Sequence, residues 1–148
     1  MTAELDGKIN IGYYEPFAML SADINLLKQT NDKYGHEAGN KLIVKAAKII
    51  CDVFKHSPVY RMGGDEFAVL LKGQDLDNLE ALILELDTRC RESILIVDGD
   101  QIPIIIARGA EIFNPLLDVS VEDVYNRADI KMYEYKEQIK RTMKNNME

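Results

Sequence analysis

The chain has 148 residues and a formal net charge of −7, with 47% hydrophobic and 29% charged residues. That length suits one domain with a buried core, and the composition is typical of a globular protein. No apolar run approaches the roughly 20 residues that span a bilayer, and no secretory signal opens the chain, so we expect a cytoplasmic segment without membrane contact. The acidic balance argues against a nucleic-acid polymer as partner. Cys51 and Cys90 lie in helical apolar patterns and are expected to be buried, reduced thiols.

The first half of the chain predicts two helices and three strands. Residues 1–12 are polar, show no clear period and are expected to form a poorly defined start. Periodicity and turn residues then place a strand, a short helix, a long amphipathic helix and two hairpin strands at 17–22, 26–34, 37–54, 58–61 and 67–71. Gly35 stops the short helix, and Gly63-Gly64 is a strong turn signal between the hairpin strands.

The second half predicts another helix, a pair of strands and a final helix. Apolar residues at helical spacing mark a helix over 79–90, and strands over 93–97 and 102–113 pair around a turn. The last helix has a capping-box-like start at Ser120, and the tail over 144–148 is expected to be frayed. This order predicts an α+β fold, an α/β sandwich with a central, mostly antiparallel sheet flanked by helices.

Acidic residues lie at the ends of predicted strands. Asp23 closes the first strand, and Asp65 and Glu66 follow the glycine turn. If those strands are neighbours, three carboxylates converge at one edge of the sheet and need a hard cation such as Mg²⁺ or Mn²⁺. The glycines would let a bulky ligand approach the backbone and would permit positive φ. Taken alone, the same residues are more often an acidic turn that serves solubility.

The segment 31–40 joins two helices and is rich in groups that could read the edge of a base. Asn31 and Asn40 each offer an amide donor and acceptor. The alternative is structural, with Gly35 as the cap that ends one helix before the next begins. Both interpretations can hold together, because a helix junction can also carry a binding site.

Cationic residues that a triphosphate would need lie in two places. Lys28 follows Asp23 on the same loop-to-helix segment, and Lys136, Lys140 and Arg141 lie together at one end of the last predicted helix. Such charges can hold phosphate groups, but a run of Lys and Arg near the C-terminus is usually a solvated face, so both interpretations stay open.

Together these motifs resemble the GGDEF domain of diguanylate cyclases. The motif itself stands intact at 63–67, preceded by Arg61, and the Asp-Ile-Asn at 23–25 with Lys28 is similar to the strand end of the family. Two further segments resemble the base-reading run and the last helix of the family, at 31–39 and 127–136. Several motifs in the family's order make the resemblance specific, and it describes 1–148 as a single GGDEF domain.

The resemblance implies a palm-like fold similar to nucleotidyl polymerases and cyclases, and condensation of two GTP molecules into cyclic di-GMP with release of two pyrophosphates. Each subunit of a homodimer would hold one GTP. By this resemblance Asp23 and Asp65 bind two Mg²⁺ or Mn²⁺ ions per active site, with the Ile24 carbonyl as a further ligand. Glu66 would assist deprotonation of the 3′-hydroxyl or bind metal.

The resemblance also assigns substrate contacts. Lys28 and Lys136 would hold the terminal phosphates, and Gly64 would let the ribose approach the backbone. Asn31 and Asn40 occupy the guanine-reading positions. At the end of the last helix, the remaining phosphate contact falls to Lys140 or Arg141.

Four departures from the family pattern bear on activity. Asn40 stands where the family usually has Asp, and we expect weaker guanine discrimination by about 1–3 kcal/mol. Ile139-Lys140 replaces a Gly-Arg pair. Residues 54–57 lack the Arg-x-x-Asp product-inhibition motif, so that site is expected to be absent. The family's opening Leu-Thr-Gly segment is not recognisable before Phe17, which predicts a fragment trimmed from a longer sensor protein.

Two other functions stay open beside the cyclase. The chain could be a GTP- or nucleotide-binding regulatory module without turnover, which Asn40, the altered helix end and the missing opening segment favour. A purely structural interaction domain ranks below both, because it needs no carboxylates beside a glycine turn. Metal-dependent GTP binding separates the first two functions from the third.

Overall fold

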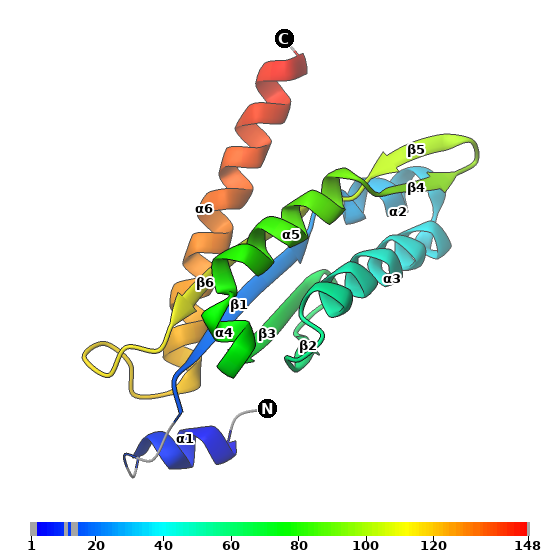
Figure 1. Cartoon of the computed structure of the whole chain (residues 1–148). Helices are drawn as coiled ribbons and strands as arrows, with labels where there is room; N and C mark the ends of the chain where they lie inside the picture. Colours follow the sequence, from blue (N-terminus) through cyan, green and yellow to red (C-terminus); the bar gives the residue numbers. More distant parts are fainter. Residues whose placement is uncertain (1–2, 11, 13–14, 148) are drawn as a thin grey trace.

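The computed structural model describes residues 3–10, 12 and 15–147 (Figure 1). A four-stranded sheet has the order β2-β3-β1-β6, and every neighbouring pair in it is antiparallel. Its strands are Val59–Arg61 for β2, Glu66–Lys72 for β3, Phe17–Ile24 for β1 and Ile106–Ile112 for β6. A separate two-stranded sheet pairs β4 (Ile94–Val97) with β5 (Asp100–Pro103). The predicted α+β architecture with an antiparallel central sheet is confirmed.

Helices cover both faces of the central sheet. On one face lie α3 (His36–Val53) and α5 (Leu79–Arg91), whose apolar side chains share a buried cluster with alternate residues of β1 and β3. On the other face α6 (Val121–Met147) packs along β6 and β1, and α1 (Ala3–Asn10) lies near its start. Figure 1 shows that the C-terminal half of α6 extends past the sheet.

The two-residue period of β1 decides which of its side chains meet α6. One alternate set joins the cluster with α3 and α5: Ala18, Leu20, Ala22 and Ile24. On the opposite side, Phe17 and Met19 join an apolar cluster at the start of α6. Further along, the Ser21 hydroxyl donates a hydrogen bond of 2.8 Å to Asp129 of α6. The pair β1 and α6 therefore changes from apolar to polar along its length.

A close approach and a helix cap fix α6 on the sheet. A Cβ built on Gly109 of β6 would lie 2.4 Å from both the Ala128 carbonyl oxygen and the Met132 nitrogen, so glycine is needed for this packing. At the start of α6, Asp6 of α1 accepts a hydrogen bond of 2.8 Å from the Val121 N–H, as an N-cap does. Residues farther along α6 take their position from these contacts.

The strand expected over 102–113 is in fact two strands in two sheets. β5 ends at Pro103, whose nitrogen has no hydrogen to donate, and β6 begins at Ile106 beside β1. Between them the Ile105 carbonyl accepts a hydrogen bond of 2.8 Å from the Asn25 N–H. The prediction is wrong because the apolar run continues across this change of partner.

The helices differ from the predictions at three places. The polar start is helical in α1, and α4 (Gly73–Asp77) has no counterpart among the predicted elements. The last helix, α6, continues past Met143 to Met147, and the frayed tail over 144–148 stays a prediction. The short helix after β1 is α2 (Leu27–Tyr34), close to its predicted bounds. Among the described residues, no helix combines the length and the apolar character needed to cross a bilayer.

The cysteines differ in burial. Both are free thiols, and Cys90 is buried, as expected. Cys51 is exposed, so its predicted burial is wrong. The buried face of α3 at this level carries Ile50 and Val53, and Cys51 lies outside it.

Candidate active site

The three carboxylates that the sequence places at strand ends converge in the structure. Asp23 in β1 pairs with Glu66 at the start of β3. The Ile24 N–H donates a hydrogen bond of 2.9 Å to the Asp65 carbonyl oxygen, which holds the turn against the end of β1. Asp23, Asp65 and Glu66 each offer a carboxylate oxygen, and these three atoms lie within 4.8 Å of one another. We call these three residues the acidic cluster.

Asp23 is buried and only half satisfied. Its Oδ2 accepts a hydrogen bond of 3.1 Å from Lys136 Nζ, whereas Oδ1 has no hydrogen-bond partner. Burial raises the pKa of Asp23 to about 6, the Lys136 hydrogen bond opposes that rise, and the charge of Asp65 adds to it. For Lys136, burial lowers the pKa, but the hydrogen bond and charge of Asp23 outweigh burial and raise it.

The acidic cluster fits a divalent cation. A buried carboxylate oxygen without a partner is costly, and gathered carboxylates repel one another. The donor set consists of oxygen atoms, the ligands that Mg²⁺ and Mn²⁺ prefer. Ile24, whose carbonyl oxygen is a further candidate ligand, lines the adjoining cavity. A cation bound here would give Asp23 Oδ1 the partner that it lacks.

The glycine turn leaves open space beside these carboxylates. The Arg61 guanidinium donates hydrogen bonds to the carbonyl oxygens of Gly63 at 3.1 Å and Gly64 at 2.9 Å. A Cβ built on either glycine would meet nothing within 4 Å, so a ligand can approach the backbone. Neither glycine has a positive φ, so the expectation that the turn needs glycine for its backbone conformation is wrong. Their contribution is the open space.

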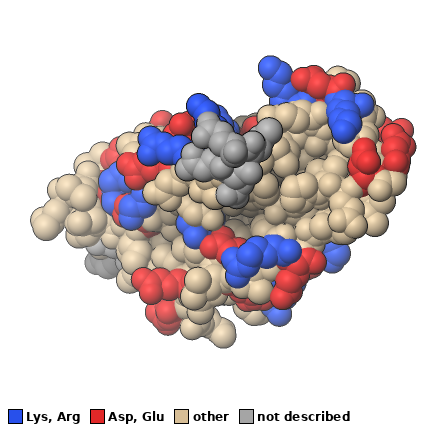
Figure 2. Space-filling view, turned by 90° about the horizontal axis from the view of Figure 1, so that it is seen from above, with Lys and Arg blue, Asp and Glu red and all other residues tan. Residues whose placement is uncertain are grey.

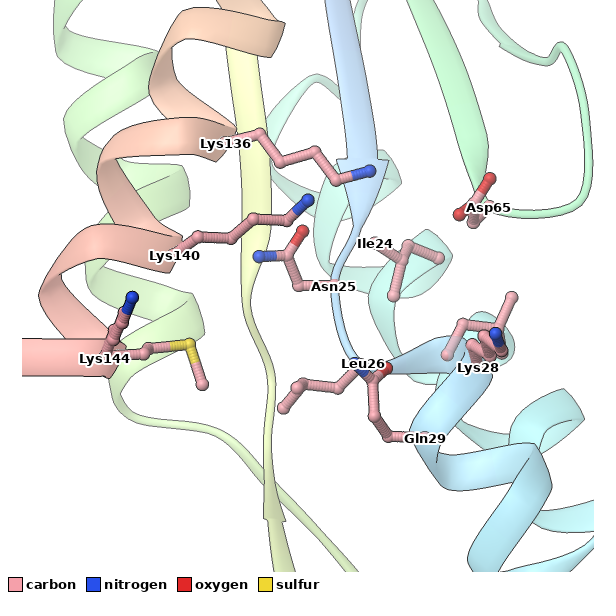
Figure 3. A pocket seen from close by; sticks show the side chains of 11 residues that line it. Ile24, Asn25, Leu26, Lys28, Gln29, Asp65, Lys136, Lys140 and Lys144 are labelled. Atoms are coloured by element: carbon pink, nitrogen blue, oxygen red, sulfur yellow. The ribbon is translucent and has the colours of Figure 1, made fainter. Parts of the chain in front are cut away.

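A cavity of about 620 Å³ adjoins the acidic cluster. Most of its charged lining is basic, with one carboxylate, and its lining residues are Ile24, Asn25, Leu26, Leu27, Lys28, Gln29, Asp65, Lys136, Lys140, Met143 and Lys144. Figure 3 shows the lysines of α6 entering from one side and Asp65 lying on the other. In Figure 2, basic and acidic side chains lie close together beside a hollow in the surface. The cavity therefore suits an anion that reaches toward a metal.

The start of α2 adds backbone donors to this cavity. Leu26 precedes α2 in the left-handed conformation, at φ 68°, and gives no side-chain cap. The first N–H groups of a helix lack intrahelical partners and carry the positive end of its dipole. Because Leu27 and Lys28 line the cavity, these groups favour a phosphate there.

A second cavity of about 410 Å³ shares Leu27, Lys28 and Asp65 with the first. Its lining also includes Asn31, Asp32, His36 and Gly64. The Asn31 amide packs against α3 where Gly39 has no side chain, since a Cβ there would lie 1.7 Å from Asn31 Oδ1. The two cavities together extend from the lysines of α6, past the acidic cluster, to an amide that can read a base.

The structure brings most of the predicted site residues together but not all of them. Asn40 is exposed near the start of α3 and does not line either cavity. Arg141 is exposed and lies outside the cavity that Lys140 lines. Lys144 and Asn25 line that cavity instead. The four-residue spacing from Lys140 was the sequence signal for Lys144, provided that the helix continues.

Comparison with known sequences places the chain among related proteins. The family model described as "Diguanylate cyclase, GGDEF domain" matches residues 1–142, including the opening segment in which no motif was recognised. The chain is 32% identical over 124 residues to "Diguanylate cyclase A" of Treponema denticola, covering 83% of this chain and 33% of that protein. It is 31% identical over 129 residues to "Probable diguanylate cyclase DgcT" of Escherichia coli, covering 82% and 27%. The chain thus spans a third or less of these relatives.

Solved structures share the fold. A sensory box/GGDEF family protein from Caulobacter crescentus superposes with a TM-score of 0.73 at 27% identity, covering 93% of this chain and 87% of that one. A GGDEF domain from Pseudomonas aeruginosa superposes with a TM-score of 0.75 at 26% identity, covering 92% and 89%. The GGDEF domain of DgcB from Caulobacter crescentus, solved with c-di-GMP, reaches 0.77 at 24% identity and covers 91% and 81%.

Proposed function

The chain belongs to the GGDEF domain family of diguanylate cyclases, and on that premise we propose that it condenses two GTP molecules into cyclic di-GMP with release of two pyrophosphates. One observation carries the proposal. The acidic cluster lies between a cavity lined by lysines and a cavity lined by an amide, and it includes a buried carboxylate oxygen without a partner. A nucleoside triphosphate needs these three environments in this order.

In this proposal Asp23 and Asp65 hold two Mg²⁺ or Mn²⁺ ions, with the Ile24 carbonyl as a further ligand. Such ions would lower the pKa of the attacking 3′-hydroxyl and stabilise the leaving pyrophosphate. Glu66 joins them as a ligand or receives the proton of the hydroxyl. Lys136 keeps Asp23 ionised, because its ammonium donates to Oδ2. The same lysine is in the cavity and can contact a phosphate.

The remaining residues bind and orient the nucleotide. The start of α2, Lys28 and Lys140 hold the β- and γ-phosphates, because they line the cavity beside Asp65. Asn31 reads the guanine edge from the second cavity, and Gly64 leaves room for the ribose. Asn40 is proposed as a second base contact, which requires its exposed side chain to turn toward the nucleotide.

Turnover requires a second subunit in this proposal. Each chain offers one continuous path for one triphosphate, so the attacking 3′-hydroxyl comes from a GTP held by a facing subunit. We also propose a cytoplasmic signalling role in which a sensor domain controls this encounter. The relatives extend well beyond the matched segment, which leaves room for such a domain in them.

A second candidate function is a nucleotide-binding regulatory module without turnover. Two observations favour it: Asn40 lies outside both cavities, and α6 continues through Ile139 where the family has a glycine. This module would bind GTP with a metal ion and release it unchanged.

Product analysis by mass spectrometry tests the proposed function. The protein at high concentration is incubated with GTP, ATP or both, first with Mg²⁺ and then with Mn²⁺. We expect cyclic di-GMP from the parent chain and none from the Asp65→Ala variant. Metal-dependent GTP binding without product, at concentrations that give a dimer, would support the regulatory module and contradict the cyclase.

A further inference from the structure

The lysines of α6 form a row that continues beyond the residues assigned above. Lys136, Lys140 and Lys144 are four residues apart and lie on one side of the helix, and all three line the 620 Å³ cavity. A rise of about 1.5 Å per residue separates the first and last Cα atoms by about 12 Å. The row exists because α6 continues without a break through Ile139.

The outer lysines have little of their charge compensated by protein. Lys136 is paired with Asp23 at 3.1 Å, whereas Lys140 lies 3.8 Å from Glu137 with both side chains exposed, a pair of small energy. No ion pair in the described part of the chain involves Lys144. The cavity thus gathers four lysines, counting Lys28, and one lining carboxylate in a protein of net charge −7.

A buried amide supplies a second, independent feature of the same place. Asn25 is 8% exposed, lines the cavity, and its Oδ1 has no hydrogen-bond partner. Figure 3 shows its side chain beside that of Lys140, between β1 and α6. An amide there can accept a hydrogen bond from a lysine ammonium and donate its own N–H groups to an anion. A buried acceptor without a partner favours a nearby donor, so the ammonium of Lys140 can satisfy Oδ1 while the amide N–H groups remain for an anion.

We propose that Lys144, with Lys140 and Asn25, forms an outer phosphate subsite one helical turn beyond the predicted phosphate contacts. The subsite binds the terminal phosphate of a linear polyphosphate whose inner phosphates lie toward the acidic cluster. This direction of the polyphosphate rests on the proposed function. Each further phosphate brings negative charge next to a lysine that protein groups leave uncompensated. Affinity therefore increases from pyrophosphate to tripolyphosphate, and Lys144 determines this preference.

Calorimetric titration with inorganic pyrophosphate and tripolyphosphate, each with Mg²⁺, tests the subsite. We expect the parent chain to bind tripolyphosphate more tightly than pyrophosphate. Lys144→Ala should weaken tripolyphosphate binding about fivefold and leave pyrophosphate binding within about twofold. Lys144→Arg should keep the preference, since it keeps the charge. Arg141→Ala is the matched control, because Arg141 is an exposed cation on the same helix outside the cavity.

Two results would overturn the subsite. One is equal affinity of the parent chain for the two polyphosphates, and the other is the same loss in Lys144→Ala as in Arg141→Ala. The titration is independent of turnover. A preference for tripolyphosphate that depends on Lys144, in a protein that makes no cyclic di-GMP, would support the subsite and contradict the cyclase. Formation of cyclic di-GMP without that preference would support the cyclase and contradict the subsite.

Discussion

The two ends of the proposed nucleotide site are built from different types of secondary structure. The acidic cluster uses side chains from two adjacent antiparallel strands and from the turn before β3, and Asp23 is buried there. The lysine row uses long side chains on one helix that extends past the sheet. Sheet register fixes the carboxylates within a few ångströms, whereas the lysines reach their ligand through flexible side chains. A metal ion needs ligands that are fixed in position, whereas a phosphate chain can be bound by flexible side chains.

Removal of the acidic end should have the largest effect. In Asp23→Asn we expect turnover to fall about 10³-fold, because a metal position supplies several kcal/mol of charge stabilisation. The measurement is the rate of cyclic di-GMP formation at saturating Mg²⁺. A variant that retains turnover within about tenfold of the parent would remove Asp23 from the metal site.

The same substitution should stabilise the metal-free protein at neutral pH. The pKa of Asp23 is raised to about 6 from an ordinary 3.8, so the folded state binds the proton more tightly. The parent chain therefore loses stability as pH rises between these values, and Asp23→Asn avoids a loss of up to about 3 kcal/mol, in which the opposing ion pair with Lys136 is already included. Urea unfolding in EDTA at pH 4 and pH 7.5 measures this difference. A gap between the two proteins that does not change with pH contradicts the expectation.

The lysine end depends on how α6 is anchored, and Asp118 provides one anchor. It is 4% exposed and accepts hydrogen bonds from Arg127 of α6 at 2.6 and 3.0 Å. Burial favours a higher pKa for Asp118, but Arg127 outweighs burial and lowers it. This stabilisation is present above pH 4 and is lost as the pH falls through the lowered pKa.

Asp118→Asn should therefore cost about 2 kcal/mol in the free energy of unfolding at pH 7. Urea unfolding at pH 7 and near pH 3 is the measurement. The difference from the parent chain should shrink in acid, and an undiminished difference would assign the effect to packing and not to charge. The acidic cluster should keep its affinity for Mn²⁺ in this variant, because its residues lie on β1, at the start of β3 and in the turn before β3, and none of them lies on α6.

The smallest effect is expected at the base. Asn40→Asp replaces an amide donor with a second acceptor, which suits the N–H groups of guanine. We expect selectivity for GTP over ATP to increase about fivefold, on the order of 1 kcal/mol. Competition binding with the two nucleotides measures it. An unchanged ratio would leave Asn31 as the base contact and exclude Asn40.

The acidic end could be predicted from the sequence because its geometry is local. Alternation along β1 and the glycine turn before β3 place Asp23, Asp65 and Glu66 at strand ends, and the antiparallel pairing brings them together. The lysine end could be predicted only in part. Arg141 and Lys144 are both near the end of α6, and the helical turn alone decides which of them faces the cavity.

Other features depended on tertiary contacts that no local pattern encodes. The apolar run around Ile105 gives no sign that the chain leaves one sheet for another. In the sequence, Asn25 is only part of the motif at 23–25. That its Oδ1 is buried without a partner depends on the tertiary packing at the end of β1. The helix over Ala3–Asn10 has a weak apolar period, and its contact with Val121 through Asp6 is long-range.

Metal dependence of nucleotide binding is the most direct test of a site with a metal end and a phosphate end. Calorimetry would use a GTP analogue with a methylene group between the α- and β-phosphates, in Mg²⁺ and in EDTA. We predict that Mg²⁺ tightens binding at least about tenfold in the parent chain and has no such effect in Asp65→Asn. Equal affinity of the parent chain in Mg²⁺ and in EDTA would contradict a metal at the acidic cluster.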